Sequence, residues 1–394
     1  MRNQPVCIGV IGLGRAFTLM LPTFQRDSRV ELVAACDPIA VARYQFVEDF
    51  AGRAYDSAEA LCADADVEMI YVASPHQFHA EHVALAAAAG KHVLLEKPMA
   101  ITLADCTKMI ADMQAAKRSL IVGHSHSFSG PVLKTRAIID SGVVGAVRMI
   151  QALNYTDFLY RPRRPEELRT EDGGGVIHSQ AAHQMDVCRV LGGGLVRSVR
   201  AHTGRWDATR PTEGAYSALL SFEGGAFASL TYSGYGHFDS DEWMDWTSEL
   251  GVKKDADSYG ATRKRHATFA NATEEMQIKV ARNYAGSSNA PSADSTAHQH
   301  FGPIIVSCER GDLRLTPQGV WIYAETERRF ESVPLEGAPR REVINEIWAT
   351  LREAKSAVHD GTWARATTEV SLAILESARE DRDVILRFQV PWQR

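Results

Sequence analysis

The chain has 394 residues, of which 45% are hydrophobic and 23% are charged, and its formal net charge is −6. This length and composition predict a globular protein of about two domains, and the slight excess of acid without a long basic run argues against nucleic acid as a partner. The sequence has no signal-type start and no apolar run long enough to span a bilayer, so we expect a cytoplasmic protein without a membrane partner.

Six cysteines are spread along the chain without a Cys-x-x-Cys pair, and most have apolar neighbours, as is typical of buried small hydrophobic residues. They predict neither a disulfide nor a structural zinc site. A metal site built from the histidines at 124, 126, 298 and 300 lacks the carboxylate or cysteine spacing that would complete it, so we expect no metal.

Residues 6–11 are almost entirely apolar and predict a buried strand, and a helix is predicted over residues 15–26. Gly12 and Gly14 lie between them. Glycines at this point let backbone N–H groups approach the pyrophosphate of a dinucleotide at the helix N-terminus. Two glycines also occur in ordinary strand-to-helix turns, and the third small position of the dinucleotide fingerprint falls on Phe17. The order of strand, turn and helix nevertheless favours a nucleotide-binding unit.

A second strand is predicted over residues 30–36 and ends at Asp37. This acid follows Gly12 at close to the spacing expected for a carboxylate that accepts hydrogen bonds from both hydroxyls of the adenosine ribose. The same carboxylate would repel a 2′-phosphate, so the sequence favours NAD over NADP. Arg43 is near enough in the sequence to keep NADP open.

Two further apolar stretches predict strands that end in polar residues: residues 67–73 precede Ser74, and residues 93–97 precede Pro98. Proline cannot continue a sheet ladder, so Lys97 stands at the carboxyl end of its strand. Strands that alternate with helices predict a parallel sheet, in which both strand ends lie along the rim where ligands bind. A solvated lysine at a strand end is the alternative. The remaining elements predicted in this half are helices over residues 56–65, 78–89 and 103–117 and a strand over residues 120–123.

Five segments carry a family resemblance: residues 9–14, 35–37, 74–79, 96–98 and 173–186, of which Glu96-Lys97-Pro98 is the most specific. With them the chain resembles, over nearly its whole length, the Gfo/Idh/MocA oxidoreductases grouped around glucose-fructose oxidoreductase and inositol dehydrogenase. The resemblance implies an α/β fold. An N-terminal Rossmann domain with a doubly wound parallel sheet, residues 1–123, would precede a C-terminal α/β domain with an open, mainly antiparallel sheet, residues 124–394. That sheet often forms a subunit interface, so we expect a homodimer or homotetramer.

The same resemblance implies roles for particular residues. Lys97 would be the catalytic or proton-shuttling group, Glu96 would contact the nicotinamide ribose, and His183 would lie in the substrate site. A core histidine at a helix start is the alternative for His183. Relatives usually carry an aspartate where this chain has Ser179, which weakens assignment to a sugar substrate. The residues expected to bind NAD are Gly12, Gly14, Arg15, Ala16, Asp37, Ser74, Pro75, His76, His79, Glu96 and Lys97.

A basic segment around Pro162, with Arg161, Arg163 and Arg164, points to an anionic substrate, because guanidinium groups pair bidentately with carboxylates. Three arginines could hold two carboxylates. A solvated basic loop or an interface rim is the alternative. The residues expected to contact the substrate are His124, His126, Arg161, Arg163, Arg164, Ser179, His183 and His300.

Residues 12–22, 123–126 and 160–165 further resemble the branch of the family that oxidises a ring cis-diol bearing two carboxylates. That likeness implies conversion of phthalate 4,5-cis-dihydrodiol to 4,5-dihydroxyphthalate with reduction of NAD, in aromatic catabolism. A neutral Lys97 would accept the hydroxyl proton as hydride passes to the nicotinamide. Two alternatives stay open: a sugar or cyclitol dehydrogenase of the same family, and a non-catalytic NAD-binding regulatory protein.

Residues 236–297 interrupt the C-terminal half with tryptophans beside acids, a basic patch and a run rich in Gly, Ser, Asn and Pro. They predict an insertion, which could be a lid, an oligomer arm or a mobile loop. The other elements expected in this half are a strand from about residue 143, strands over residues 304–308 and 319–323, and helices over residues 180–191, 342–359 and 367–378.

Overall fold

The computed structural model describes residues 4–123, 126–287 and 295–393. The chain folds into two compact units. The first consists of residues 1–123, 277–292 and 337–368, and the second of residues 124–276, 293–336 and 369–394. Two segments of the predicted C-terminal half therefore group with the first unit.

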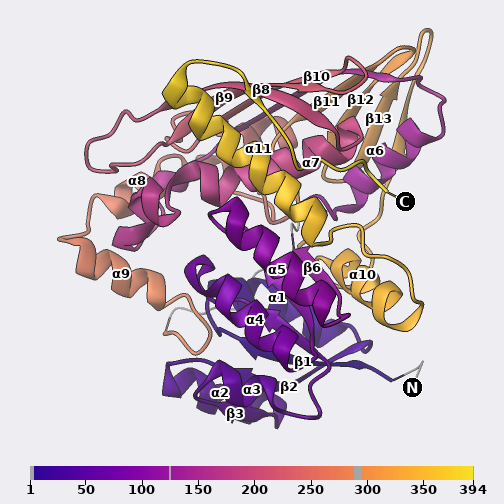
Figure 1. The fold of residues 1–394 in the computed structure, drawn as a ribbon. Coiled ribbons are helices and arrows are strands. Elements are labelled where there is room, and N and C mark those ends of the chain that lie inside the picture. Colours follow the sequence, from indigo (N-terminus) through magenta and orange to yellow (C-terminus); the bar gives the residue numbers. More distant parts are fainter. Residues whose placement is uncertain (1–3, 124–125, 288–294, 394) are drawn as a thin grey trace. The chain divides into compact units, whose positions relative to one another are not determined.

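The first unit contains a six-stranded parallel sheet in the order β3-β2-β1-β4-β5-β6 (Figure 1). The strand order reverses at β1, so the crossover helices lie on both faces, and the predicted doubly wound sheet is confirmed. The strands are β1 (Val6–Ile11), β2 (Val30–Cys36), β3 (Arg53–Tyr55), β4 (Met69–Val72), β5 (His92–Glu96) and β6 (Leu120–Gly123). The sequence does not predict β3 or the helix that precedes it, α2 (Ala40–Phe50).

The other helices of this unit are α1 (Arg15–Arg26), α3 (Ala58–Cys62), α4 (His79–Ala88), α5 (Leu103–Ala115) and α10 (Arg341–Arg352). Apolar side chains on both faces of the sheet pack against them. On one face, Val72 belongs to a buried cluster that includes Val83 on α4 and Met109 on α5. On the other face, the ring of Phe24 on α1 lies 5.4 Å from the ring of Tyr71. This packing fixes the strand ends that carry the predicted cofactor residues.

Residues 337–368 join the first unit through ion pairs and backbone hydrogen bonds. Arg352, at the end of α10, makes a bidentate pair with Glu68 just before β4, with N to O distances of 2.6 and 2.7 Å. The N–H of Val122 donates to the carbonyl of His359 (2.8 Å), so this segment also covers the edge of the sheet at β6. The predicted helix over residues 342–359 ends earlier, at Arg352.

The second unit contains a nine-stranded sheet in the order β14-β13-β12-β11-β7-β10-β9-β8-β15 (Figure 1). Every neighbouring pair is antiparallel except β7 with β10, so the predicted open, mainly antiparallel sheet is confirmed. The strands are β7 (Val147–Tyr155), β8 (Val196–Gly204), β9 (Ala215–Phe222), β10 (Phe227–Ser233), β11 (Ile304–Cys308), β12 (Gly311–Thr316), β13 (Gly319–Tyr323), β14 (Arg328–Ser332) and β15 (Val384–Ile385).

Helices α6 (Gly130–Asp140) and α7 (Ala182–Gly192) pack against this sheet, α6 on β12 and β13 and α7 on β7 and β10. The longest helix, α11 (Gly361–Glu380), contains the boundary between the two units. One set of side chains in the sheet shares a face and is partly exposed. Leu219, Ser229, Gln151 and Ile305 lie opposite one another across four strands, and Leu219 and Ile305 are 46% and 43% exposed.

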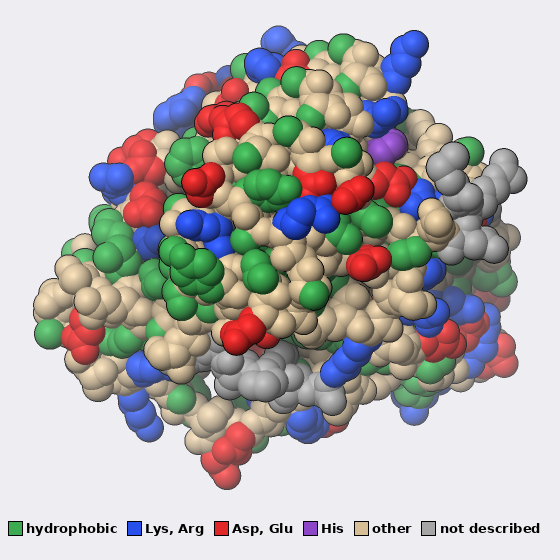
Figure 2. Space-filling model, turned by 90° about the horizontal axis from the view of Figure 1, so that it is seen from below, with side chains coloured by type: hydrophobic (Ala, Val, Ile, Leu, Met, Phe, Trp, Pro, Cys, Tyr) green, Lys and Arg blue, Asp and Glu red, His purple; other side chains and the backbone are tan. Residues whose placement is uncertain are grey.

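None of the described helices is both long and apolar enough to cross a membrane. Figure 2 shows one face of the molecule, on which acidic, basic and apolar side chains are interspersed. Because positive and negative side chains are mixed there, neither sign of charge dominates the electrostatic potential of that face.

The predicted insertion contains two short helices, α8 (Ala261–His266) and α9 (Ala272–Val280). Glu275 on α9 makes a buried bidentate ion pair with Arg210, at 2.8 and 3.1 Å, and also accepts the backbone N–H of Arg163 (2.8 Å). The guanidinium of Arg263 on α8 lies 3.9 Å from the ring centroid of Tyr160. These contacts attach the part of the insertion in the second unit to the loop that carries the arginine segment.

Candidate active site

The glycine turn after β1 combines a close backbone approach at Gly12 with an open position at Gly14. Gly12 has a φ of +95°, and a Cβ there would lie 2.8 Å from the backbone nitrogen of Ser74, so only glycine fits this close approach. A Cβ on Gly14 would meet nothing within 4 Å. The N-terminus of α1 therefore opens onto free space, where its N–H groups can bind a pyrophosphate. Arg15 and Ala16 form the first turn of this helix.

Asp37 is held by the backbone at the end of β2. It is 7% exposed, and its two carboxylate oxygens accept the N–H groups of Leu13 (2.7 Å) and Ile39 (2.8 Å). A carboxylate oxygen keeps a further lone pair, which can accept a ribose hydroxyl. Arg43 donates from Nη1 to the backbone carbonyls of Asp37 (2.7 Å) and Pro38 (3.2 Å). These contacts fit a ribose diol at this position.

The ends of β4 and β5 lie side by side, since Val72 is in register with Leu95. The hydroxyl of Tyr71 donates to the carboxylate of Glu96 at 2.6 Å. Burial, and then the charge of Glu96, raise the pKa of Tyr71 well above its ordinary value, so the phenol stays a donor. Burial lowers the pKa of Arg340, while the charge of Glu96 opposes that shift. Glu96, the residue before Lys97, thus has a fixed donor in Tyr71 and interacts electrostatically with Arg340.

His79 connects the turns that follow these two strands. Its Nε2 lies 3.0 Å from the carbonyl oxygen of Ser74, and its Nδ1 lies 3.1 Å from that of Pro98. Burial lowers the pKa of His79 to about 4, against the opposing effect of these carbonyls. The neutral ring donates from only one nitrogen. The sequence predicts that His79 binds the cofactor, whereas the structure buries it behind the turn that contains Lys97, where it positions the backbone.

The sequence does not single out His82, although it lies in the same region. Its Nδ1 is 2.9 Å from the hydroxyl of Ser74, and its ring stacks on Phe78 at 6.0 Å. Pro75 and His76 follow Ser74 in the turn that begins a short 3-10 helix, His76–Phe78. Ser74 therefore has a side-chain partner that orients its hydroxyl.

In the second unit, four rings form an aromatic cluster: His126, His183, Tyr232 and Phe301. The rings of His126 and His183 meet edge to face at 4.5 Å, and each lies 5.3 Å from Phe301, which stacks on Tyr232 at 5.9 Å. Both histidines are buried. The structure thus brings two predicted substrate residues together and adds two aromatic residues that the sequence does not identify. Flat side chains of this kind suit a planar ring as ligand.

His183 lies on the first turn of α7, directly after a π-helical turn, Ile177–Ala181, that contains Ser179. Such turns are frequent at functional sites, because they rotate the residues that follow. Gln184, the next residue, accepts the hydroxyl of Tyr216 (2.7 Å), which anchors α7 to the sheet. His124, the remaining predicted histidine in this region, lies outside the described residues.

Two of the three predicted arginines already have carboxylate partners in the protein. Arg161 pairs with Asp157 at 2.8 Å and with Glu249 at 3.4 Å. Burial disfavours its charge, but these carboxylates more than offset that effect and raise the pKa of Arg161. Arg164 pairs with two glutamates of its own loop, at 3.2 and 3.8 Å. Neither guanidinium is fully available to an anionic substrate.

Arg163 is different, because it has no ion pair with a carboxylate among the residues that the structure describes. Its guanidinium lies 3.5 Å from the ring centroid of Phe158, and Nη2 donates to the carbonyl of that residue (2.7 Å). Its buried Nε has no hydrogen-bond partner within the described part of the chain. Burial lowers the pKa of Arg163 to about 10. A partly buried guanidinium with an unused donor is suited to bind a carboxylate.

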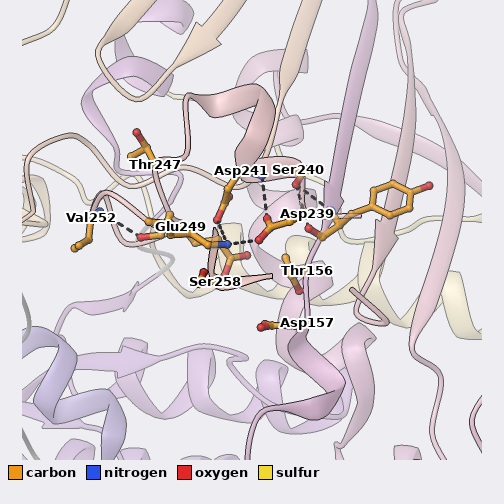
Figure 3. Close-up of polar contacts among 12 residues, drawn as sticks. Thr156, Asp157, Asp239, Ser240, Asp241, Thr247, Glu249, Val252 and Ser258 are labelled. Atoms are coloured by element: carbon orange, nitrogen blue, oxygen red, sulfur yellow. Dashed lines mark hydrogen bonds and ion pairs between the residues drawn. The ribbon is translucent and has the colours of Figure 1, made fainter. Parts of the chain in front are cut away.

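A second polar network lies near Glu249, the ion-pair partner of Arg161. Figure 3 shows the carboxylates of Asp239 and Asp241 converging on one ammonium, which belongs to Lys254 and is 2.9 Å from Asp241. Glu249 accepts the side-chain amide of Asn154 (3.0 Å). Asp241 is 5% exposed, and burial raises its pKa to about 7 although Lys254 opposes the shift. This carboxyl therefore titrates near neutral pH.

Both ring nitrogens of His300 are used by the protein. Nε2 donates to the carbonyl of Thr247 (2.8 Å), and Nδ1 accepts the N–H of Gly302 (3.0 Å). This pattern defines a neutral ring, in agreement with the lowering of the pKa of His300 by burial. His300 thus orients the backbone beside Phe301, and its predicted contact with substrate stays a prediction. Among the described residues, no group of three or more His, Cys, Asp or Glu side chains could hold a metal ion.

Comparison with known proteins decides the family. Residues 6–124 match the oxidoreductase family model with an NAD-binding Rossmann fold, and residues 132–248 match the GFO/IDH/MocA C-terminal domain. The chain is 47% identical over 377 residues to 1-carboxy-3-chloro-3,4-dihydroxycyclohexa-1,5-diene dehydrogenase of Comamonas testosteroni, and the match covers 95% of each chain. The chain belongs to the Gfo/Idh/MocA family of oxidoreductases. It is an NAD-dependent dehydrogenase, as the glycine turn and Asp37 predict.

Three further matches have lower sequence identity. Inositol 2-dehydrogenase of Salmonella typhimurium is 31% identical over 151 residues, which are 37% of this chain and 45% of that protein. Among solved structures, a putative dehydrogenase from Bordetella bronchiseptica superposes with a TM-score of 0.92 at 37% identity, covering 97% of this chain and all of that one. Levoglucosan dehydrogenase has a TM-score of 0.73 at 16% identity, over 97% and 99% of the chains, and shares the fold.

Proposed function

We propose that this dehydrogenase oxidises a carboxylated cyclohexadiene cis-diol to the corresponding catechol, with phthalate 4,5-cis-dihydrodiol, which would give 4,5-dihydroxyphthalate in aromatic catabolism, as the first substrate to test. The observation that carries the proposal is Arg163, a partly buried residue whose Nε is buried without a hydrogen-bond partner and whose guanidinium has no carboxylate partner among the described residues. Further support comes from the Comamonas relative, whose name describes a carboxylated cyclohexadiene diol. Such a reaction oxidises the CH–CH bond of a dihydrodiol overall.

The chemistry requires a base for one hydroxyl and an acceptor for one hydride. We assign the base to Lys97, at the end of β5, because an amine that has lost its proton can accept the hydroxyl proton as the C–O bond becomes a carbonyl. Bound at the glycine turn and Asp37, NAD would supply the acceptor for the hydride that leaves the carbinol carbon. The hydroxy-ketone then tautomerises to the aromatic catechol, so the products are catechol, NADH and one proton.

His183 is assigned to orient the diol or to share its proton. Its ring is packed edge to face on His126 and tilted against Phe301, which leaves it little freedom to rotate. An imidazole can donate a hydrogen bond from one ring nitrogen and accept one at the other. The stacked rings of Phe301 and Tyr232 in the same cluster support His183 from within the core.

The number of carboxylates on the substrate is the open choice within this proposal. Arg161 and Arg164 are paired with acids of the protein, which leaves Arg163 as the principal anion-binding group. This arrangement favours one tightly held carboxylate. The phthalate diol bears two carboxylates, only one of which Arg163 would hold tightly. A monocarboxylated diol, like the one in the name of the Comamonas relative, is therefore included as a second candidate substrate.

The test is NADH formation, followed by absorbance, from NAD and each of four compounds: phthalate 4,5-cis-dihydrodiol, a monocarboxylated cyclohexadiene cis-diol, inositol and glucose. We expect turnover with a carboxylated diol, a catechol as product, and loss of turnover in a folded Lys97→Ala variant. Turnover of inositol or glucose alone would establish a sugar or cyclitol dehydrogenase instead. NAD binding without turnover of any compound would favour a regulatory protein.

We also propose that the enzyme forms a homodimer or homotetramer through the partly exposed face of the nine-stranded sheet. Leu219 and Ile305 lie on that face, together with Phe227, which is 41% exposed. A surface with several large apolar side chains is typical of a subunit contact. Light scattering of the wild type and of Leu219→Lys measures the mass, and an unchanged monomeric mass in both would contradict this interface.

A further inference from the structure

Residues 277–287, at the end of the insertion, belong to the first unit and lie on the glycine turn. The backbone N–H of Tyr284 donates to the carbonyl oxygen of Leu13, between the two glycines, at 3.2 Å. Its ring packs edge to face on Phe17 of α1 at 5.2 Å, and its hydroxyl donates to Asp49 on α2. Tyr284 is 5% exposed. One tyrosine thus ties this distant segment to the turn and to two helices.

Positive charge collects at the same place. Arg15 is the first residue of α1, and Arg282 stands two residues before Tyr284. Burial, and then the charges of Arg282 and Arg340, lower the pKa of Arg15 to about 10. The positive end of the α1 dipole adds to this field. The dinucleotide brings two phosphates to a helix N-terminus, where the guanidinium groups of nearby arginines can form charge-assisted hydrogen bonds with them.

We propose that residues 277–287 form a cofactor clamp, in which Tyr284 fixes the segment on the glycine turn and Arg282 acts with Arg15 to bind the pyrophosphate of NAD. The family models match residues 6–124 and 132–248, so this segment lies outside both. The clamp concerns the cofactor and does not depend on which diol is oxidised. It gives the end of the insertion a role in holding NAD, in place of a free surface loop.

The test is equilibrium binding to the full-length protein, followed by NADH fluorescence and by calorimetry with ADP and adenosine. Arg282→Gln should weaken the binding of NADH and of ADP about tenfold, because roughly one charge-assisted contact is lost. The affinity for adenosine should stay unchanged. Arg265→Gln, which removes an exposed cation from α8 of the same insertion, is the matched control and should bind all three ligands as the wild type does.

Tyr284→Ala should weaken NADH binding and speed its dissociation in stopped flow, whereas Tyr284→Phe keeps the ring on Phe17 and should retain most of the affinity. Circular dichroism and the melting temperature establish that each variant is folded. The clamp would be ruled out if folded Arg282→Gln bound NADH and ADP as tightly as the wild type. It would also be ruled out if the substitution weakened adenosine binding as much as ADP binding, since Arg282 would then not act through the phosphates.

Discussion

The hydroxyl of Tyr71 donates a 2.6 Å hydrogen bond to the carboxylate of Glu96, the residue that precedes Lys97 at the end of β5. Tyr71 is 1% exposed and lies on the neighbouring strand, β4, so this donor cannot move away. The bond links a buried core residue to the rim where the cofactor binds. It gives a direct way to disturb Glu96 without touching the predicted base.

Tyr71→Phe removes this donor and keeps the ring in the core. We expect the KM for NAD to rise by about 5- to 20-fold, because a hydrogen bond to a charged group contributes roughly 1–2 kcal/mol. The melting temperature should change little, since phenylalanine fills the same space. The matched control is Tyr55→Phe, which removes a hydroxyl bonded to Asp64 (2.9 Å) near the far edge of the sheet. A KM for NAD that changes equally in both variants would contradict a role for Glu96 in cofactor binding.

Arg163 should determine recognition of the carboxylate. Arg163→Gln removes the partly buried guanidinium, and we expect kcat/KM for a carboxylated diol to fall by about 100-fold or more, which corresponds to roughly 3 kcal/mol. NADH binding should be unaffected. Arg164→Gln is the control, because Arg164 is paired with glutamates of its own loop. This substitution should lower kcat/KM by less than about fivefold. Equal losses in the two variants would mean that the segment acts only through the stability of its loop.

Asp241 should make the stability of the protein depend on pH. Its pKa is raised by burial to about 7, so between about pH 4 and pH 7 the folded protein holds a proton that the unfolded chain has released. Stability contributed by that proton therefore falls as the pH rises through this window, by at most about 4 kcal/mol. The groups that act on Asp241 are Lys254, Glu249 and Asp239, and His300 lies 3.8 Å away.

Urea unfolding at pH 5 and pH 8 measures this dependence. Asp241→Asn cannot ionise, so its free energy of unfolding should decrease less between the two pH values than that of the wild type. Asp245→Asn, which changes an exposed carboxylate paired with Lys253, controls for the loss of one charge. The same decrease in the wild type and in Asp241→Asn would show that the carboxyl does not titrate in this range.

The ion pair between Arg210 and Glu275 should anchor the insertion. Glu275→Gln leaves a guanidinium that is 2% exposed without its counter-charge, and breaking such a buried pair costs about 3–5 kcal/mol. Thermal melting should show this loss. The double variant Arg210→Met with Glu275→Leu removes both charges and should recover most of the stability. A single variant as stable as the wild type would mean that the pair is not buried in solution.

Much of the first unit could be predicted because its signals are local. The apolar run of β1, the glycine turn and the spacing to Asp37 are read directly along the chain, and all three occur as expected. Helix α2 was not predictable in this way. Its exposed face carries Val41, Tyr44 and Val47, at 59%, 71% and 43% exposure, so it lacks a clear alternation of apolar and polar faces.

The substrate half was harder to predict because it depends on contacts between distant residues. His126 and His183 could be named one at a time, but their packing on Phe301 follows from strand register and helix placement. The ion-pair partners of the arginines could not be predicted from the sequence either. Arg161 pairs with Glu249, far along the chain, so the expectation that all three arginines face the substrate gives way to Arg163 as the principal candidate.

The most direct test of the proposed reaction compares two cis-diols of the same ring, phthalate 4,5-cis-dihydrodiol and the cyclohexadiene cis-diol that lacks carboxylates. The measurement is kcat/KM for NAD reduction by the wild-type enzyme. We expect the carboxylated diol to be favoured by about 100-fold or more, since one buried charge-assisted pair contributes roughly 3 kcal/mol. Equal values for the two diols would contradict the proposed function. It would also be contradicted if NAD were reduced neither by these diols nor by the monocarboxylated diol.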